Sequence, residues 1–216
     1  MTRMALNKIH WPVTALGPGE RVGIWMQGCS IHCPGCMSLD TWGTPDESWT
    51  TVGNVLATIE QPLACADGVT ISGGEPFDQP QALLALVTGL KDMTRELDKP
   101  LDVLCYSGRP LQLLRDHYGE ILGHLDAIIS DPFARRLPSR LVWRGSSNQR
   151  LTPLSDLGQQ RYAPYLHAEV ESPQVQIEVD DESIWMIGIP SRATLEKLES
   201  TLTQRGILLG EPSWRS

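Results

Sequence analysis

The sequence lacks long hydrophobic runs and an excess of basic charge. No apolar stretch approaches the ~18 residues that a membrane helix requires, which argues against a membrane-spanning protein. Lys and Arg number 18 against 26 Asp and Glu, and the formal net charge of −8 argues against nucleic-acid binding. The first residues also lack the apolar segment of a secretory leader. We therefore expect a cytoplasmic protein.

The sequence also lacks the cysteines for a disulfide framework. It has five, an odd number, and three of them are crowded into GCSIHCPGC at residues 28–36. Cys33 and Cys36 have the spacing of a redox CxxC pair, but a metal in a reducing compartment suits the segment better.

A fourth thiol is missing from this segment. A structural zinc site takes four protein ligands and would need Cys65, Cys105 or a histidine such as His32, which keeps zinc open as an alternative. A [4Fe-4S] cluster normally takes four thiolates as well. With three, one iron is left open for a substrate or a second cofactor.

Short apolar segments that end in glycine or serine alternate with segments of helical periodicity. We expect strands at 21–28, 68–74, 101–108 and 125–130, and helices at 48–61, 78–97 and 109–125, with Asp78 as an N-cap. Such alternation predicts an α/β fold with a parallel sheet. Ligands of these sheets lie beyond the carboxyl ends of the strands, where the cysteines, SGGEP, YSG and SDPF all fall. A closed barrel takes roughly 250 residues, so we expect a partial, open β/α barrel.

The regular alternation of strand-like and helix-like segments ends near residue 151. Residues 152–173 show no clear periodicity and are interpreted as a long connection, followed by strands at 174–180 and 183–190 around an acidic turn. A helix is expected from Ser191 to Gly206. The predicted division is a core at 1–151 and a ββα extension at 152–216, packed on the core.

One segment, residues 131–150, departs from the acidic balance. Five arginines face the single acid Asp131: Arg135, Arg136, Arg140, Arg144 and Arg150. The segment is interpreted either as a solvated basic face or as a site for an anion or an acidic partner.

The CxxxCxxC segment after one strand and SGGEP after the next together resemble the radical S-adenosylmethionine (SAM) superfamily. The resemblance implies that Cys29, Cys33 and Cys36 bind a [4Fe-4S] cluster whose open iron is chelated by the methionine part of SAM. It also implies that the second segment binds the methionine amino group, through Ser72, Gly73, Gly74, Glu75 and Pro76. Glycines allow close approach of the backbone, and a carboxylate can meet an ammonium group.

Further segments of the sequence resemble one group within this superfamily. The stretch from Gly17 to Cys36 with Thr41 and Trp42, then CYSG, ISDPF and LVWRGSSNQR, is similar to glycyl-radical-enzyme activases, especially those of anaerobic ribonucleotide reductase. By this resemblance, Ser107 and Asp131 join the SAM pocket. One departure is Gly35, where many superfamily members carry an aromatic residue. Cys65 and Cys105 are interpreted as small buried residues.

The resemblance implies an enzyme that reductively cleaves SAM to a 5′-deoxyadenosyl radical and generates a glycyl radical on a partner enzyme. It also implies a flavodoxin- or ferredoxin-type electron donor. Two alternatives stay open: a radical SAM enzyme acting on a small molecule or peptide, similar to 7-carboxy-7-deazaguanine synthase, and a non-catalytic iron-sulfur electron-transfer module.

Overall fold

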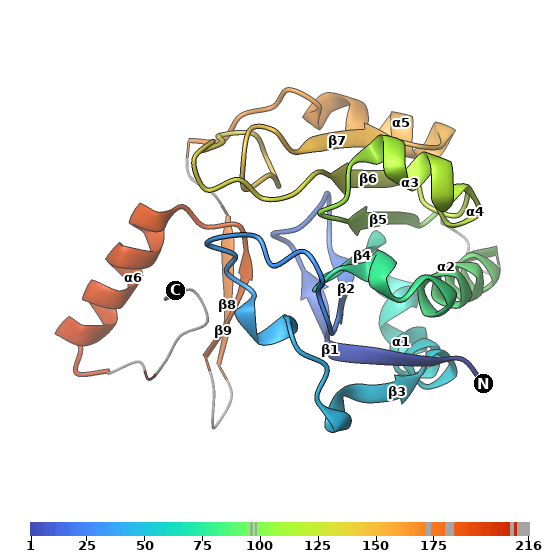
Figure 1. Cartoon of the computed structure of the whole chain (residues 1–216), viewed down its shortest axis with the longest axis horizontal. Helices are drawn as coiled ribbons and strands as arrows, with labels where there is room; N and C mark the ends of the chain where they lie inside the picture. Colours follow the sequence, from blue (N-terminus) through green and yellow to red (C-terminus); the bar gives the residue numbers. More distant parts are fainter. Residues whose placement is uncertain (96, 98, 172–173, 180–183, 208–209, 211–216) are drawn as a thin grey trace.

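A seven-stranded sheet in the order β3-β1-β2-β4-β5-β6-β7 forms the centre of the protein, in a computed structural model that describes residues 1–95, 97, 99–171, 174–179, 184–207 and 210 (Figure 1). Its strands are β1 (Arg3–Val13), β2 (Arg21–Met26), β3 (Trp49–Thr51), β4 (Gly68–Gly73), β5 (Asp102–Tyr106), β6 (Ala127–Ser130) and β7 (Arg150–Pro153). Strands β2, β4, β5 and β6 are mutually parallel, whereas β1, β3 and β7 pair antiparallel with their neighbours. The predicted α/β class with a largely parallel sheet is confirmed, and the open barrel stays a prediction.

Strand β1 was not anticipated from the sequence. Its eleven residues, RMALNKIHWPV, mix polar and apolar side chains irregularly, and its register against β2 shifts at two places. Periodicity therefore does not identify it. The strand forms because β2 and β3 hydrogen-bond to its two edges.

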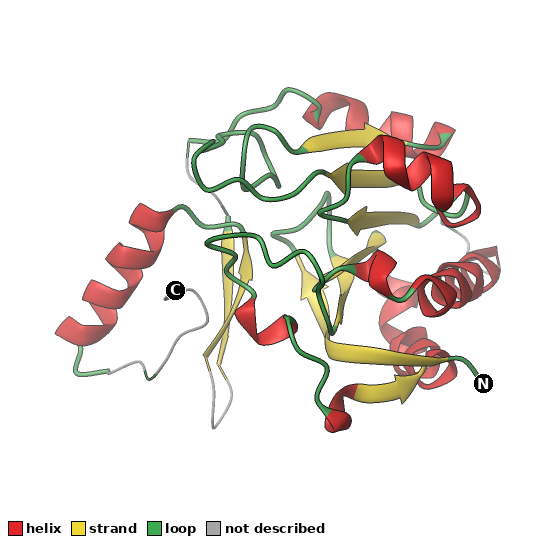
Figure 2. Ribbon diagram, viewed as in Figure 1, coloured by secondary structure: helices red, strands yellow, loops and turns green. Residues whose placement is uncertain are grey.

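The main helices cover one face of the sheet (Figure 2). They are α1 (Val52–Cys65), α2 (Pro80–Arg95), α3 (Leu111–His117) and α4 (Gly119–Leu122). Apolar residues at helical spacing, such as Leu83, Leu86 and Leu90 of α2, are fully buried against alternate strand residues such as Ile24 and Ile71. The predicted N-cap of α2 is wrong, because Asp78 lies in a 3-10 turn (η3, Pro76–Asp78) and its carboxylate binds other loops.

The segment 152–173 is not a plain connection. It contains α5 (Asp156–Tyr162) and a 3-10 turn (η4, Ala163–Tyr165), both too short for periodicity to reveal. Tyr162 is fully buried among Leu104, Ile129 and Leu151 on the sheet face opposite α1 and α2. It donates a hydrogen bond to Asp102, which also pairs with Arg21 at 2.7 Å. A wholly buried ion pair thus ties α5 to the amino ends of the parallel strands.

The tail contains a hairpin and a helix, and their interpretation as a separate extension stays a prediction. The elements are β8 (Val175–Val179), β9 (Ile184–Gly188) and α6 (Arg192–Gln204). Ser191 caps α6 by accepting the N–H of Thr194 at 3.2 Å, and Gly206 follows the helix with φ of +77°. The predicted acidic turn lies at 180–183, outside the described residues.

The hairpin covers part of the sheet face opposite α1 and α2. Trp185 of β9 meets Trp25 of β2 edge to face, with ring centroids 5.0 Å apart, and Ile187 is buried beside Val13. In Figure 1, α6 lies on the far side of the hairpin from the sheet. The boundary at 151 between core and extension stays a prediction. No helix in the described part of the chain is long and apolar enough to cross a membrane.

Candidate functional site: four loops around three thiols

The candidate site is built from the four loops that leave the carboxyl ends of the parallel strands. The cysteine loop follows β2, the SGGEP loop follows β4, the YSG loop follows β5 and the SDPF loop follows β6. Because these strands are parallel neighbours, their loops emerge at one edge of the sheet. The sequence-predicted site residues are brought together there.

The SGGEP loop is hydrogen-bonded to the residues just before Cys29. Gly74 donates its N–H to the Met26 carbonyl at 2.8 Å, and Glu75 donates to the Gly28 carbonyl at 2.9 Å. A Cβ on Gly74 would lie 2.0 Å from the Gly28 oxygen, and Gly73 has φ of +105°. Glycine is therefore required here so that two backbone segments can meet, a reason that the sequence did not reveal.

The Glu75 carboxylate joins the SGGEP loop to the YSG loop. It is 1% exposed and accepts hydrogen bonds from the Ser107 hydroxyl at 2.8 Å, the Gly108 N–H at 2.8 Å and the Phe77 N–H at 3.0 Å. Burial raises the pKa of Glu75 above its ordinary value, and the three hydrogen bonds oppose that rise. In this structure Glu75 anchors two loops.

The YSG loop is in turn bonded to the SDPF loop. Ser107 donates its N–H to the Ile129 carbonyl at 2.9 Å, and Asp131 donates to the Arg109 carbonyl at 3.1 Å. Asp131 adopts a left-handed φ of +81° and accepts the Ser130 hydroxyl at 3.0 Å. Ser107 and Asp131 thus lie in adjacent, directly bonded loops, and their place in a SAM pocket stays a prediction.

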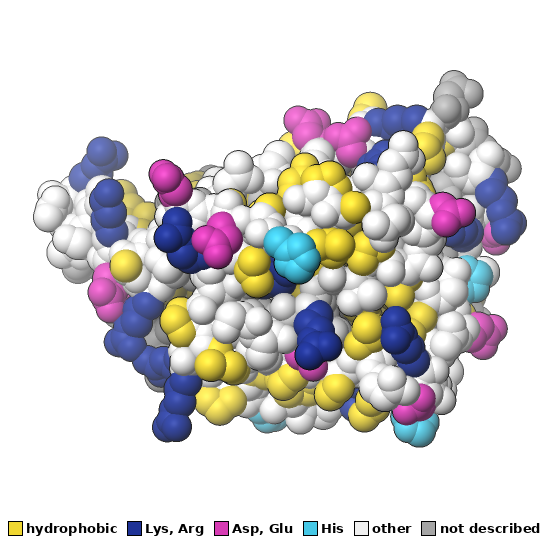
Figure 3. Space-filling model, turned by 90° about the horizontal axis from the view of Figure 1, so that it is seen from above, with side chains coloured by type: hydrophobic (Ala, Val, Ile, Leu, Met, Phe, Trp, Pro, Cys, Tyr) yellow, Lys and Arg dark blue, Asp and Glu magenta, His cyan; other side chains and the backbone are white. Residues whose placement is uncertain are grey.

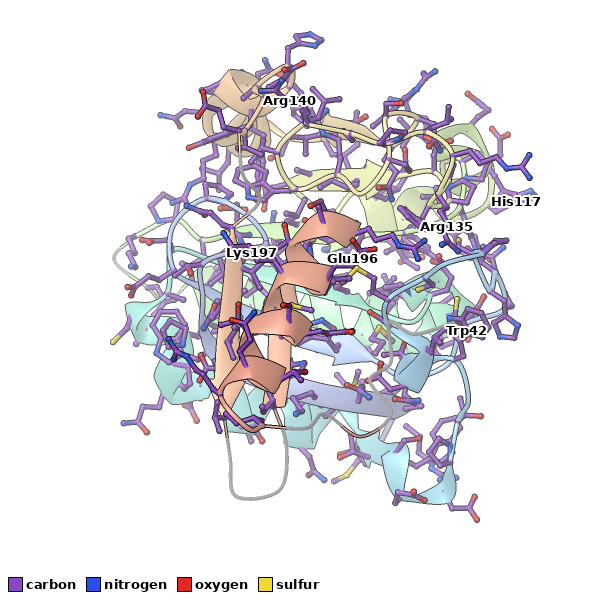
Figure 4. The ribbon with its side chains drawn as sticks, turned by 90° about the vertical axis from the view of Figure 1, so that its left-hand side faces the viewer. Trp42, His117, Arg135, Arg140, Glu196 and Lys197 are labelled. Carbon is purple, nitrogen blue, oxygen red and sulfur yellow. The ribbon has the colours of Figure 1, made fainter. Side chains whose placement is uncertain are left out.

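The SDPF loop closes the ring against the cysteines. The backbone of Phe133 lies near enough to the Cys33 thiol to oppose the rise in its pKa that burial causes. The stem of Arg135 packs on Gly35, where an added Cβ would lie 2.9 Å from the arginine Cδ. In Figure 4, Arg135 lies on the same side of the molecule as Trp42, which follows the cysteine loop. Gly35 also has a φ of +79°, so an aromatic residue here would be strained even if the Arg135 side chain moved aside.

The three thiols are partly buried and free of disulfide bonds. Burial raises the pKa of the Cys29 thiol, while backbone hydrogen bonds from His32 and Ile31 act in the opposite direction. Burial also raises the pKa of Cys33, and the charges of Cys36 and Cys29 raise it further. The three sulfur atoms are thus close enough to repel one another as thiolates, a cost that a bound cationic centre offsets.

These residues fit a [4Fe-4S] cluster better than a single ion. In the described residues, no three His, Cys, Asp or Glu side chains converge on a point that could hold one metal ion. Each thiolate of a cluster binds a different iron, so cluster ligands surround a volume instead of meeting at a point. Cys29, Cys33 and Cys36 are free, partly buried thiols of one loop, and three thiolates suit three of the four irons.

The predictions for the two other cysteines, Cys65 and Cys105, have different outcomes. Cys105 is fully buried in β5, as expected, but the prediction that Cys65 is buried is wrong, because it lies exposed at the end of α1. The apolar run before Cys65 belongs to the opposite side of the helix, where Leu63 is buried.

The contacts that Asp78, His32 and Trp42 make around the site were not predicted from the sequence. Asp78 binds Ser30 of the cysteine loop and Arg109 of the YSG loop, and His32 stacks on Trp42 with ring centroids 4.3 Å apart. The Trp42 carbonyl also accepts the Cys29 N–H at 3.1 Å. The partners of Asp78 are 48 and 31 residues away in the chain, and no local sequence pattern predicts any of these contacts.

The arginine-rich segment does not form one exposed basic strip. Arg144 is 6% exposed and donates to the carbonyls of Leu166 and Tyr165 at 2.9 and 2.8 Å, so it is a structural residue. Arg140 lies 3.7 Å from Glu169. On the face seen in Figure 3, basic and acidic side chains are interspersed with hydrophobic ones. Arg135, Arg136 and Arg150 are exposed, and Arg135 lies beside the cysteine loop.

The sequence model of the family described as "4Fe-4S single cluster domain" matches residues 15–152. This range contains all four loops of the site.

The relatives of this chain include proteins named anaerobic ribonucleoside-triphosphate reductase-activating protein. The one from Enterobacteria phage T4 is 29% identical over 144 residues, which cover 65% of this chain and 88% of the relative. The one from Pasteurella multocida is 30% identical over 142 residues, which cover 62% of this chain and 87% of the relative. Among solved structures, QueE from Escherichia coli aligns over 96% of this chain and 92% of its own, at 16% identity and a TM-score of 0.41, a likeness too loose to define the fold.

Proposed function

The chain belongs to the 4Fe-4S single cluster domain family and is a radical SAM enzyme of the glycyl-radical-activating group, and we propose that its partner is an anaerobic ribonucleotide reductase. The observation that carries the proposal is the ring of loop contacts around Cys29, Cys33 and Cys36. We propose a reductase as the partner because the relatives from phage T4 and Pasteurella multocida are named as reductase-activating proteins.

The three thiolates would hold the cluster and leave one iron open for the methionine part of SAM. When bound and reduced, the cluster supplies the electron for cleavage of SAM to methionine and a 5′-deoxyadenosyl radical, which abstracts hydrogen from the partner's glycine. The protein contributes binding, orientation and exclusion of water.

We assign the remaining predicted residues to the SAM pocket as part of the proposal. The set is Ser72, Gly73, Gly74, Glu75, Pro76, Ser107 and Asp131, and it is supported by the hydrogen bonds that join their three loops. Since the Glu75 carboxylate already accepts three hydrogen bonds, we assign it to holding the pocket in shape. Backbone groups of the SGGEP loop are then the groups offered to the methionine amino group.

The electron donor is proposed to be a flavodoxin- or ferredoxin-type protein that approaches over the SDPF loop. Arg135 and Arg136 are exposed there, and Arg135 packs on Gly35 of the cysteine loop, in a chain with a formal net charge of −8. An acidic donor would be repelled by most of the surface and attracted at this point. The proposal includes a cytoplasmic location, because free thiols persist in a reducing compartment.

The proposal is tested with the anaerobic ribonucleotide reductase of the same organism. The reconstituted protein, SAM and a reductant are expected to produce the doublet spectrum of a glycyl radical on the reductase, measured by electron paramagnetic resonance. A Cys33→Ala variant serves as the control and should give no signal. Cleavage of SAM without a radical on the reductase would reject this partner.

A further inference from the structure

Asp78 joins three of the four loops of the site through one carboxylate. It ends the η3 turn, just past the SGGEP segment. One oxygen accepts the Ser30 N–H at 2.6 Å, and the other accepts the Ser30 hydroxyl at 2.9 Å and Nη2 of Arg109 at 2.5 Å. Ser30 directly follows Cys29, and Arg109 directly follows the YSG segment.

The geometry makes these contacts strong for a site at the molecular surface. The side chains of Asp78 and Arg109 are 19% and 25% exposed, so solvent screens their ion pair less than an open surface pair. All three hydrogen bonds have an ionised acceptor, which makes them shorter and stronger than neutral ones. Both oxygens are used, so the direction of the carboxylate is fixed from two sides.

The connection extends to the rest of the ring. The backbone carbonyl of Arg109 accepts the N–H of Asp131, and the hydroxyl of Ser107 accepts the N–H of Arg109. Asp78 therefore relates the position of Cys29 to the two loops that carry Ser107 and Asp131.

We propose that Asp78 is a positioning residue that sets the cysteine loop in register with the SAM-pocket loops, so that a cluster on the three thiols faces bound SAM at the right separation. This inference rests on the proposed function. It concerns the relative placement of cluster and SAM, and the cluster ligands themselves are unchanged by it.

Two substitutions separate the contacts that Asp78 makes. Asp78→Ala removes all three hydrogen bonds. Asp78→Asn keeps an acceptor for the Ser30 N–H, while its amide group can donate to the Ser30 hydroxyl but repels the donor Nη2 of Arg109. Asp78→Ala should therefore change loop hydrogen exchange and SAM affinity more than Asp78→Asn does. Asp92→Ala is the matched control, since Asp92 is an exposed acid that pairs only locally with Arg95.

The first measurement uses the full chain without iron or SAM. Amide hydrogen exchange in residues 30–36 should become roughly tenfold faster in Asp78→Ala than in the unchanged protein, as expected for loss of a coupled, partly buried pair. Exchange in α2 should stay unchanged. Unaltered exchange in the loop would overturn the proposal, as would a uniform increase over the whole chain, which would show general loss of stability.

The second measurement uses chains reconstituted to equal iron content. SAM binding, followed by its effect on the resonance spectrum of the reduced cluster, should weaken roughly tenfold in Asp78→Ala, less in Asp78→Asn and not in Asp92→Ala. Unchanged SAM affinity at equal iron content would overturn the proposal, and so would loss of the cluster itself in Asp78→Ala. If the unchanged protein holds its cluster but does not bind SAM, the proposed function fails, and the hydrogen-exchange result alone decides the role of Asp78.

Discussion

At the scale of single residues, binding of the cluster depends on three of the five thiols, and Cys65 and Cys105 cannot replace them. Replacing Cys29, Cys33 or Cys36 with Ala should abolish uptake of a [4Fe-4S] cluster, because two thiolates leave two irons without protein ligands. The matched control is Cys65→Ser, since Cys65 is exposed at the end of α1 and takes no part in the loop. Iron and sulfide content after anaerobic reconstitution measures the effect. A full cluster in all three variants would refute the assignment.

Glu75 makes a second prediction, about pH. Because burial raises its pKa above the ordinary 4.5, the folded protein holds this proton to higher pH than the unfolded chain does. Stability from this group is therefore present at low pH and declines as pH rises through the window between the two pKa values. Glu75→Gln stays neutral and lacks this decline.

Urea unfolding of both proteins, over a pH range that starts below the ordinary pKa of 4.5 and extends above it, tests the prediction. The free energy of unfolding of the unchanged protein, relative to that of Glu75→Gln, should fall across this range. A rise would show that the hydrogen bonds from Ser107, Gly108 and Phe77 outweigh burial.

The residues that could be read from the sequence are those whose partners lie nearby in the chain. Cys29, Cys33 and Cys36 form one short pattern, and SGGEP forms another. Asp78 was misassigned as a helix cap because its partners, Ser30 and Arg109, are 48 and 31 residues away. Such contacts depend on the sheet, which brings the loops together only after folding.

At the scale of elements, the buried pair of Arg21 and Asp102 links β2 and β5 to α5. Both side chains are fully buried, and Asp102 also accepts hydrogen bonds from Arg161 and Tyr162 of α5. Asp102→Ala would leave Arg21 buried and uncompensated, at a cost of about 3–5 kcal/mol in the free energy of unfolding. Urea denaturation measures the cost.

The exposed pair of Asp92 and Arg95 provides the comparison, with side chains 63% and 73% exposed. Asp92→Ala should change stability by no more than about 0.5 kcal/mol. Equal effects of the two substitutions would mean that the buried pair does not hold the elements together.

Elements were predictable where their apolar residues follow a clear period. The strands that became β2, β4, β5 and β6 and the helices that became α1, α2 and α6 were all expected from the sequence. β1 and α5 were not, for different physical reasons. β1 depends on pairing with its neighbours, and α5 has only seven residues, with Tyr162 and Gly158 as its buried positions.

At the scale of the whole molecule, the structure separates α5 from the hairpin and α6. A chain ending after residue 171 keeps β7, α5 and the bonds to Asp102, whereas a chain ending after residue 151 loses Arg161 and Tyr162. The longer truncated chain should unfold cooperatively and take up a cluster. The shorter one should do neither, because it loses the buried Tyr162 and the hydrogen bonds that Arg161 and Tyr162 donate to Asp102. Calorimetry and iron content distinguish the two, and a well-folded shorter chain would show that α5 is dispensable.

The most direct test of the central claim, that this chain carries out radical SAM chemistry, is formation of 5′-deoxyadenosine. The anaerobically reconstituted protein is supplied with SAM and dithionite, beside a Cys33→Ala control. If the three thiolates hold the cluster that cleaves SAM, the unchanged protein forms 5′-deoxyadenosine and the variant forms none. Absence of product from a protein with a full, reducible cluster and its reductase partner present would contradict it.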